Sequence, residues 1–597
     1  MGYSAPALDK DRIMTPTRQR PTHWQWAIVG VLILLFAFYY GLLALQKHDA
    51  LVTSIDLANA NNTLWNTLNG QPFRMTTHGN MSSRLAMHLE PLLLALVPLY
   101  ALVPSPKTLL LVQAVVLALA AVPLYLLATE ALDNAWLALI FPLLYLLSPA
   151  VHNAALADFH AVALGVLPAL AALLALWRGH TRAALLFAFL ALLAREDYGL
   201  WLAALAAIGW WRTRNRSSGI GPIWIAVGLF GLAWFAFALL LLAPIFTEGQ
   251  GSVFWERYRF WLEGPQAWLE QGLLLEKGRY LLLLLLMGGA GALLAPLWIL
   301  PALPALGLNL LSNYPLPVTL DAYYSVLVFP MLLAASAIGL GAMRSRGLGV
   351  RGLAVALVVL LVAALWVHLS EGRSPLVPGF RPPQRTLHSQ TLPEVLATLP
   401  ADAPLSATAA VSPHASGREL IRLFPRRKNA AYAVVDVYQD RTSHPVSARR
   451  RLLRLVDGDW GIRAGKHGFL VLEAGGTQAD IPAEFYTFAR PDGEPQYPVS
   501  VVFADTWELQ GFDVFWDYWG RPATRLYWRV LAPPDGDWQP AVLGLDPAGR
   551  VLATPDTHTP VTLLWLPTSQ WQPGQTYVVE MLPFDAGDEV VLVAGVG

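Results

Sequence analysis

Ionisable and aromatic side chains gather at four places along the chain, each beside a long apolar stretch. The second of these places holds Asp158 and His160, which are separated by a single residue. The other three hold, in chain order, Asp56, Asn59, Trp65, Arg84, His88 and Glu90, then Arg257 and Arg259, then Asp321 and Tyr324. Ionisable groups are costly to keep beside a membrane segment, so in a membrane protein they are the first candidates for function.

Two kinds of chemistry fit these residue types. A carboxylate such as Asp56, just beyond the first apolar segment, can accept or orient the proton of an acceptor hydroxyl. The pairs Asp158–His160 and His88–Glu90 have the ligand types of a divalent metal such as Mg²⁺ or Mn²⁺. Arginine binds phosphate through parallel hydrogen bonds, and three arginines stand in these intervals, Arg84, Arg257 and Arg259.

Structural interpretations stand beside the chemical ones. Asp56 could instead cap a helix, and Asp158 with His160 could hold their loop through hydrogen bonds without a metal. The charged triplet Arg195-Glu196-Asp197 fits a buried ion-pair network. Arginines in outer segments are also typical interfacial anchors.

The composition indicates that these groups belong to a polytopic membrane protein. Of the 597 residues, 55% are hydrophobic and only 14% are charged. One soluble core cannot bury that many apolar side chains, whereas a bilayer removes them from water directly. The zero net charge provides no basic surface for nucleic acid, and the absence of cysteine excludes disulfides and thiolate chemistry.

The distribution of basic residues predicts the topology. A basic tail, residues 1–23, precedes an apolar run from Trp26 to Leu45, so we expect a cytoplasmic N-terminus in the plasma membrane. Basic loops near Arg178, Arg212 and Arg344 belong on the same side. Outer loops then fall at 47–106, 148–160, 247–279 and 312–323 of a helical membrane domain, residues 24–370, with about ten or eleven membrane segments.

Three segments of this domain need separate treatment. Pro91–Pro104 is too short to span comfortably, so we interpret it as a juxtamembrane or re-entrant helix on the outer side. The stretch from Arg182 to Arg212 has basic residues at both ends and is predicted to be a helical hairpin with the charged triplet at its tip. Tyr280–Leu300 is predicted to return across the bilayer to the inner side.

The C-terminal third is predicted to be extracytoplasmic and to contain two folded units. After a linker at 371–391, residues 392–475 alternate helix-like and strand-like stretches, which is an α/β pattern. A second linker at 476–496 leads to a β-sandwich at 497–597, with strands such as Val499–Phe503, Thr524–Val530 and Val561–Leu566. Its aromatic residues are interpreted as strand packing rather than as a sugar-stacking face, Trp516, Tyr518, Trp519, Trp528 and Trp571.

Several short motifs together resemble a family of predicted bacterial integral-membrane proteins of unknown function. They are Asp56-Leu57, Leu64-Trp65-Asn66, His88-Leu-Glu-Pro91, Leu147-Ser-Pro-Ala150, Asp158-Phe-His160, Arg195-Glu-Asp197 and Asn309-Leu-Leu-Ser-Asn-Tyr314. That family is similar to the GT-C superfamily of membrane glycosyltransferases, which take a sugar from a polyprenyl-phosphate donor. The resemblance implies a GT-C-like membrane domain, an acidic catalytic residue at Asp56 and a second acidic residue at Asp158 near donor phosphate or metal.

The resemblance leads to one preferred function and two alternatives. The preferred function is transfer of a sugar from a polyprenyl-phosphate donor to an unknown acceptor on the outer face of the membrane. The polar residues lie in outer loops and no repeated halves are evident, which disfavours a transporter or flippase. Relatives commonly have glycine where this chain has Ala58, and that departure leaves a catalytically degenerate scaffold that binds a cell-envelope partner as the other alternative.

Overall fold

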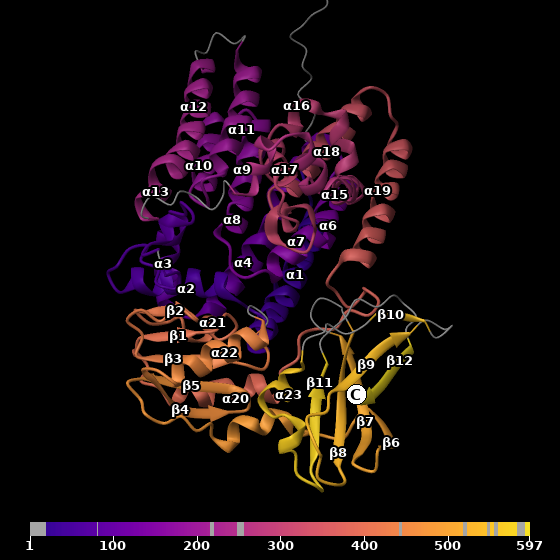
Figure 1. Ribbon diagram of the computed structural model, residues 1–597. Coiled ribbons are helices and arrows are strands. Elements are labelled where there is room, and N and C mark those ends of the chain that lie inside the picture. The colour runs from indigo at the N-terminus through magenta and orange to yellow at the C-terminus, as the bar shows by residue number, and fades with distance from the viewer. Residues whose placement is uncertain are drawn as a thin grey trace, which may run out of the picture.

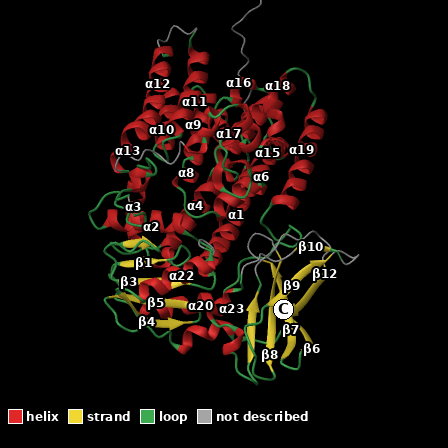
Figure 2. Ribbon diagram, in the orientation of Figure 1, coloured by secondary structure: helices red, strands yellow, loops and turns green. Residues whose placement is uncertain are grey.

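The helices gather at one end of the molecule and most strands at the other. A computed structural model describes residues 20–79, 81–214, 220–247, 256–440, 444–516, 522–545, 550–553, 559–581 and 591–596. In Figure 1 the helical domain is at the top, and the two strand-containing units lie below it. Figure 2 shows the same division, with red helices above the yellow strands.

The membrane domain consists of helices of unequal length. Its first half contains α1 (His23–Asp49), α2 (Ile55–Leu68), α3 (Leu92–Leu102), α4 (Pro106–Leu119), α5 (Ala121–Leu132), α6 (Ile140–Leu147), α7 (Pro149–Leu156), α8 (Ala161–Leu164), α9 (Val166–Trp177), α10 (Thr181–Leu192) and α11 (Tyr198–Thr213). Its second half contains α12 (Gly221–Phe237), α13 (Ala243–Phe246), α14 (Pro265–Gln271), α15 (Leu274–Leu286), α16 (Pro296–Ile299), α17 (Leu303–Leu311), α18 (Val328–Ser345) and α19 (Val350–Glu371).

Only some of these helices are long and apolar enough to cross a bilayer alone. Among the described residues there are 5 such spans, or 6 if the bent pair α6–α7 counts as one. The other expected crossings are shorter helices, including α9 and α10. The segment Pro91–Pro104 forms the 11-residue helix α3, and the charged triplet lies in the turn between α10 and α11.

The predicted span Tyr280–Leu300 is not one continuous helix. The chain leaves α15 at Leu286, forms a 3-10 segment at Gly289–Leu294, and resumes as the short helix α16. The break allows close packing against α18, because a Cβ atom on Gly339 would lie only 2.1 Å from the Gly291 carbonyl oxygen. Glycine tolerates both the irregular backbone and this approach.

Ion pairs gather the basic loops at one end of the helical domain. At the end away from the strands, Arg178 pairs with Glu130 at 2.7 Å and Arg344 approaches Asp133 at 3.7 Å. Arg212 donates to the Trp177 carbonyl there at 3.2 Å. The three basic loops thus meet at one end, while the C-terminal units lie at the other, which is the arrangement expected from the charges (Figure 1).

The α/β unit has a mixed five-stranded sheet. Its order is β2-β1-β3-β5-β4, with β1 parallel to both neighbours and β5 antiparallel to β3 and β4. The strands are β1 (Leu405–Ala407), β2 (Ile421–Leu423), β3 (Tyr432–Asp436), β4 (Trp460–Lys466) and β5 (Phe469–Ala474). The helices are α20 (Leu387–Ala397), α21 (Ser412–Ala415) and α22 (Pro445–Val456). Strand β2 is the sheet edge nearest α2 (Figure 1).

The last unit contains two antiparallel sheets, which agrees with the expected β-sandwich. Their orders are β11-β8-β7-β6 and β10-β9-β12. The strands are β6 (Tyr497–Phe503), β7 (Trp507–Trp516), β8 (Pro522–Val530), β9 (Pro540–Leu545), β10 (Val551–Ala553), β11 (Thr576–Glu580) and β12 (Val591–Val596). The predicted strand Val561–Leu566 is wrong, because Val561–Trp565 forms the short helix α23 directly after Pro560. Proline favours such a helix start.

The two C-terminal units share a hydrophobic core. The interval 476–496, expected to be a linker, contains a 3-10 helix at Ala483–Ala489 whose Phe485 and Phe488 are buried between the units. Trp528 is fully buried, and Trp571 stacks on Tyr577 at 4.4 Å, so both pack the core as expected. The predictions for the side chain of Trp516, and for Tyr518 and Trp519, lie outside the described residues.

Candidate functional site

Asp158 fixes the start of helix α2. Its Oδ2 accepts from the backbone N–H of Ser54 at 2.8 Å and of Leu57 at 3.4 Å, and its Oδ1 is 4.0 Å from Lys47 Nζ. The N–H groups of a first helical turn have no partner within the helix, so a carboxylate there stabilises it. Burial raises the pKa of Asp158, and Asp56 raises it further, while Lys47 opposes both effects. Asp158 therefore joins α1, α2 and the loop before α8.

Asp56 lies in that first turn and is open to solvent. Its side chain is 49% exposed, and its Oδ2 is 3.6 Å from His160 Nε2. Burial acts to raise the pKa of Asp56, but the hydrogen bond and charge of His160, with the charges of Arg84 and His88, outweigh it and lower the pKa to about 2. The carboxylate is therefore ionised at every physiological pH.

The proposed metal ligands do not fit a metal site. Both oxygens of Asp158 face donors of the protein, and His160 directs Nδ1 to the Asp158 carbonyl and Nε2 to Asp56. The expected pair His88–Glu90 is separated, since His88 bonds Glu196 instead. Among the described residues, no group of 3 or more His, Asp or Glu side chains could hold a metal ion.

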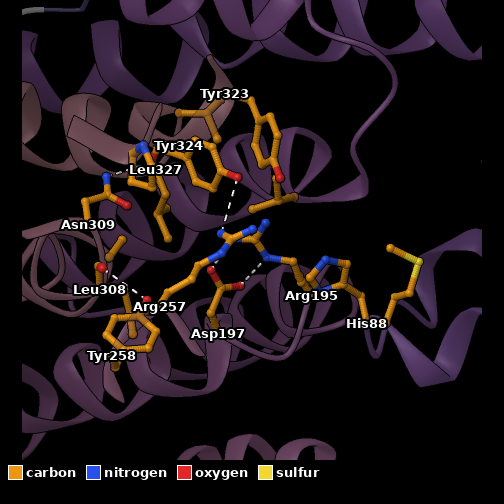
Figure 3. Close-up of a pocket in the computed structure, with 15 residues that line it drawn as sticks. His88, Arg195, Asp197, Arg257, Tyr258, Leu308, Asn309, Tyr323, Tyr324 and Leu327 are labelled. Atoms are coloured by element: carbon orange, nitrogen blue, oxygen red, sulfur yellow. Dashed lines mark hydrogen bonds and ion pairs between the residues drawn. The ribbon is translucent and has the colours of Figure 1, made fainter. Parts of the chain in front are cut away.

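A cavity of about 140 Å³ lies beside Asp56 and His160, between helices of the two halves of the membrane domain. Arg195 Nε donates to Asp197 Oδ1 at 2.9 Å, and Arg257 Nη1 donates to Tyr324 Oη at 3.4 Å. Figure 3 shows both guanidinium groups reaching the middle of this space, with the Asp197 carboxylate beside Arg195. The lining holds two arginines and one carboxylate, so the guanidinium groups can bind an anion such as phosphate.

His88 enters the same cavity and is oriented by a buried carboxylate. Its Nδ1 is 2.8 Å from Glu196 Oε1, while Glu196 Oε2 accepts from the Leu89 N–H at 2.9 Å. A carboxylate on Nδ1 orients the ring so that Nε2 can exchange a proton with a ligand in the cavity.

Tyr323 connects Asp56 with the cavity. Its ring stacks on His160 with 3.6 Å between centroids, and it lines the cavity next to Tyr324. The Arg195 guanidinium carbon lies 6.0 Å from the Tyr323 ring centroid. The ionised carboxylate, the two arginines and the His88–Glu196 pair therefore belong to one continuous site.

The remaining predicted binding residues lie outside the cavity. Arg84 and Glu90 form a buried ion pair of 2.8 Å behind it. Asn59 Oδ1 accepts from Thr77 Oγ1 at 2.6 Å, and Trp65 lies next to Gly417 of the α/β unit. The last two are Arg259, which is exposed, and Asp321, which is 3.5 Å from Arg373. Their roles in substrate binding stay predictions.

The sequence interpretation missed four members of the site. Arg195, Glu196 and Asp197 were interpreted as a structural network, and Tyr323 was not singled out. All four lie in the cavity wall or bond a residue in that wall. The available signal was a charged triplet inside an apolar stretch, since such a triplet at membrane depth is a functional candidate by default.

Comparisons with known proteins identify a family and a similar chain trace. A family model described as "Predicted membrane protein (DUF2079)" matches residues 47–450. Two crystal structures of ArnT from Cupriavidus metallidurans are similar, one bound to undecaprenyl phosphate and one in the apo state. Their TM-scores are 0.47 and 0.46 and their identities 13% and 14%, with 77% and 76% of this chain and 100% of each ArnT chain covered. No curated protein sequence matches the chain.

Proposed function

The chain belongs to the DUF2079 family of predicted membrane proteins, and we propose that it is a membrane glycosyltransferase. In this proposal a sugar moves from a polyprenyl-phosphate donor to an acceptor hydroxyl at the outer face of the plasma membrane. The basic loops lie on the cytoplasmic side, and the two C-terminal units lie outside. The matched interval, residues 47–450, includes every residue that the mechanism uses.

One observation carries the proposal. An ionised, half-exposed carboxylate, Asp56, is joined through His160 and Tyr323 to a cavity that is lined by Arg195 and Arg257. Glycosyl transfer from a lipid phosphate needs these two features together. A negative group must face the sugar as positive charge develops at its anomeric carbon, and positive groups must face the departing phosphate.

The pKa of Asp56 decides between its two proposed roles. A general base works best with a pKa near the operating pH, and a carboxylate with a pKa of about 2 is a weak base. Asp56 therefore orients the acceptor hydroxyl and stabilises positive charge on the sugar. His88 is the better placed proton acceptor, because it lines the cavity and Glu196 holds its Nδ1 at 2.8 Å.

The transfer is then a single displacement at the anomeric carbon of the sugar. The acceptor oxygen forms a bond to the anomeric carbon while the bond from that carbon to the phosphate oxygen breaks. The acceptor proton passes to His88 Nε2, and the negative charge remains on the lipid phosphate beside Arg195 and Arg257. Asp158 acts as a positioning residue, because its bonds to Ser54 and Leu57 hold the turn that carries Asp56.

A transporter is less well supported by the same contacts. Broken helices in transporters typically surround a substrate at mid-membrane. Here the break between α15 and α16 brings Gly291 against Gly339, so the irregular backbone serves helix packing. The charged residues instead gather around a cavity at one end of the helices.

The decisive experiment follows labelled sugar from polyprenyl-phosphate donors in membranes that contain the wild type or Asp56→Asn. We expect Asp56→Asn to lower transfer by about 10³-fold or more, since the interaction acts on transition-state charge. Asp133→Asn is the matched control, because its carboxylate is 42% exposed at the opposite end of the bundle. Wild-type turnover by Asp56→Asn would overturn the mechanism, and donor binding without any transfer by wild type would favour a binding scaffold.

A further inference from the structure

A second cavity of about 230 Å³ lies where helix α13 reaches the α/β unit. Its wall combines the loop after α2, the end of α13 and strand β2, and it has no lining residue in common with the cavity around Arg257. The main residues of its wall are Arg74, Thr76, Ser82, Ile245, Phe246 and Arg422. This space, here called the lateral cavity, is not used in the proposed transfer.

The polar side of the lateral cavity carries an excess of positive charge. Arg74 pairs with Glu419 at 2.7 Å, which leaves Arg422 and the neighbouring Arg426 without a carboxylate in the ion pairs of the described residues. Arg426 lies against the loop, since a Cβ atom on Gly79 would be 2.7 Å from Arg426 Cδ. Burial lowers the pKa of Arg422, and the charges of Arg74 and Arg426 lower it further. Such a cluster favours an anion.

Arg422 is held by the backbone but keeps an unused donor. Its Nη1 donates to the Thr76 carbonyl at 2.9 Å and to the His78 carbonyl at 3.3 Å, which fixes the guanidinium plane. Its Nε is buried and has no hydrogen-bond partner among the residues that the structure describes. A buried donor without a partner is costly, so an oxygen that reaches it would be bound favourably.

The other side of the lateral cavity opens onto an apolar surface. Ile245 of α13 is 70% exposed. Further exposed apolar residues lie on α12 and on the segment that joins it to α13, including Leu229, Leu232, Phe237, Leu240 and Leu241. Residues 238–242 form a π-helical segment, a feature often found at functional sites. The arginines therefore stand at one end of this exposed apolar surface.

We propose that the lateral cavity binds the phosphate headgroup of a membrane amphiphile, with the phosphate on Arg74 and Arg422 and the acyl chains along α12 and α13. A free phosphate ion would use the same arginines but would leave Ile245 and the helix surface above it without a role. The positions of the arginines relative to the exposed apolar residues favour the lipid. The occupant is thus a phospholipid or another phosphorylated lipid of the outer leaflet.

The test measures binding to the purified full-length protein in a zwitterionic detergent. Three probes separate the sources of binding: dioctanoyl phosphatidic acid, dioctanoylglycerol, and inorganic phosphate. We expect saturable binding of the phosphatidic acid that falls about tenfold or more in Arg74→Gln/Arg422→Gln, because charge-assisted hydrogen bonds are lost. Arg422→Lys keeps the positive charge, so it should lose less affinity for phosphatidic acid than Arg74→Gln/Arg422→Gln does.

One matched variant locates the site. Arg427→Gln removes the same charge from the adjoining exposed tract, so it should bind phosphatidic acid as wild type does. Equal loss in Arg427→Gln would overturn the proposal in favour of general charge attraction. Equal affinity for dioctanoylglycerol would exclude headgroup recognition, and equal affinity for inorganic phosphate would exclude the lipid.

Discussion

Helix α2 contains two kinds of polar residue that look alike in the sequence. In its first turn, Asp56 is half exposed and directs its carboxylate toward His160 beside the cavity. In the following turns, Asn61 and Asn62 are at most 1% exposed and bond the α/β unit. One short helix therefore supplies a reactive group at its start and a docking surface along the rest of its length.

The two kinds of residue differ in whether their polar atoms already have hydrogen-bond partners within the protein. Asn62 Nδ2 donates to the Arg418 carbonyl at 2.8 Å, and its Oδ1 accepts from the Thr76 N–H at 2.9 Å. Both ends of that amide are occupied, so no atom is left for a ligand. Around the cavity, by contrast, the described residues bond His88 only at Nδ1, and they give the Arg257 side chain one long hydrogen bond. Polar clusters at a membrane edge thus separate into structural and functional groups by their unused atoms.

The largest of these effects is expected when the His88–Glu196 pair is removed. We expect His88→Ala to lower transfer by about 10²–10⁴-fold, the usual range for loss of an acid–base group. Glu196→Gln should cause part of that loss, and the double variant should be no worse than His88→Ala alone, because Glu196 acts through His88. Additive losses in a kinetic double-mutant cycle would show that the two residues act independently.

A second, smaller effect concerns the charge state of Asp56. His160→Phe keeps a ring to stack on Tyr323 but removes the hydrogen bond and charge that lower the Asp56 pKa from its ordinary 3.8 to about 2. Burial then acts with less opposition, so the pKa rises and the carboxylate becomes protonated at higher pH. We expect the lower apparent pKa of the acid limb of the pH–rate profile, the one that reports Asp56 rather than the proton acceptor, to move upward by about one pH unit or more.

The control for that profile is His180→Phe, an exposed histidine in the loop before α10. Its acid limb should coincide with that of the wild type. An unchanged limb in His160→Phe would mean that His160 does not set the protonation of Asp56.

The smallest effect on transfer is expected on the docking surface. Asn62→Ala leaves the buried Thr76 N–H and the Arg418 carbonyl without a partner, which costs about 1–3 kcal/mol. The melting temperature should fall while transfer at low temperature stays within about twofold of wild type. Asn69→Ala, at the exposed end of the same helix, should change neither. Lost transfer with an unchanged melting temperature would make Asn62 a substrate ligand.

Much of the architecture was predictable, because a membrane segment can be recognised from one continuous stretch of the sequence. Apolar runs and basic loops identified α1, α19 and the hairpin of α10 and α11 without any knowledge of packing. The break after α15 was missed, because Gly291 serves a contact with Gly339 that is distant in the sequence. The short helix α23 was missed because five residues give too little periodicity to distinguish helix from strand.

The membrane domain, the strand-containing units after it and the polar residues at their boundary could all be predicted from the sequence. These properties depend on composition and on neighbours along the chain. The partners of those polar residues are set by the fold: His88 bonds Glu196, which is 108 residues away, and Asn62 bonds the Arg418 carbonyl, which is 356 residues away. Hydrogen bonds act over about 3 Å in space and are indifferent to sequence distance, so a side chain's type indicates its chemistry and only its neighbours decide its use.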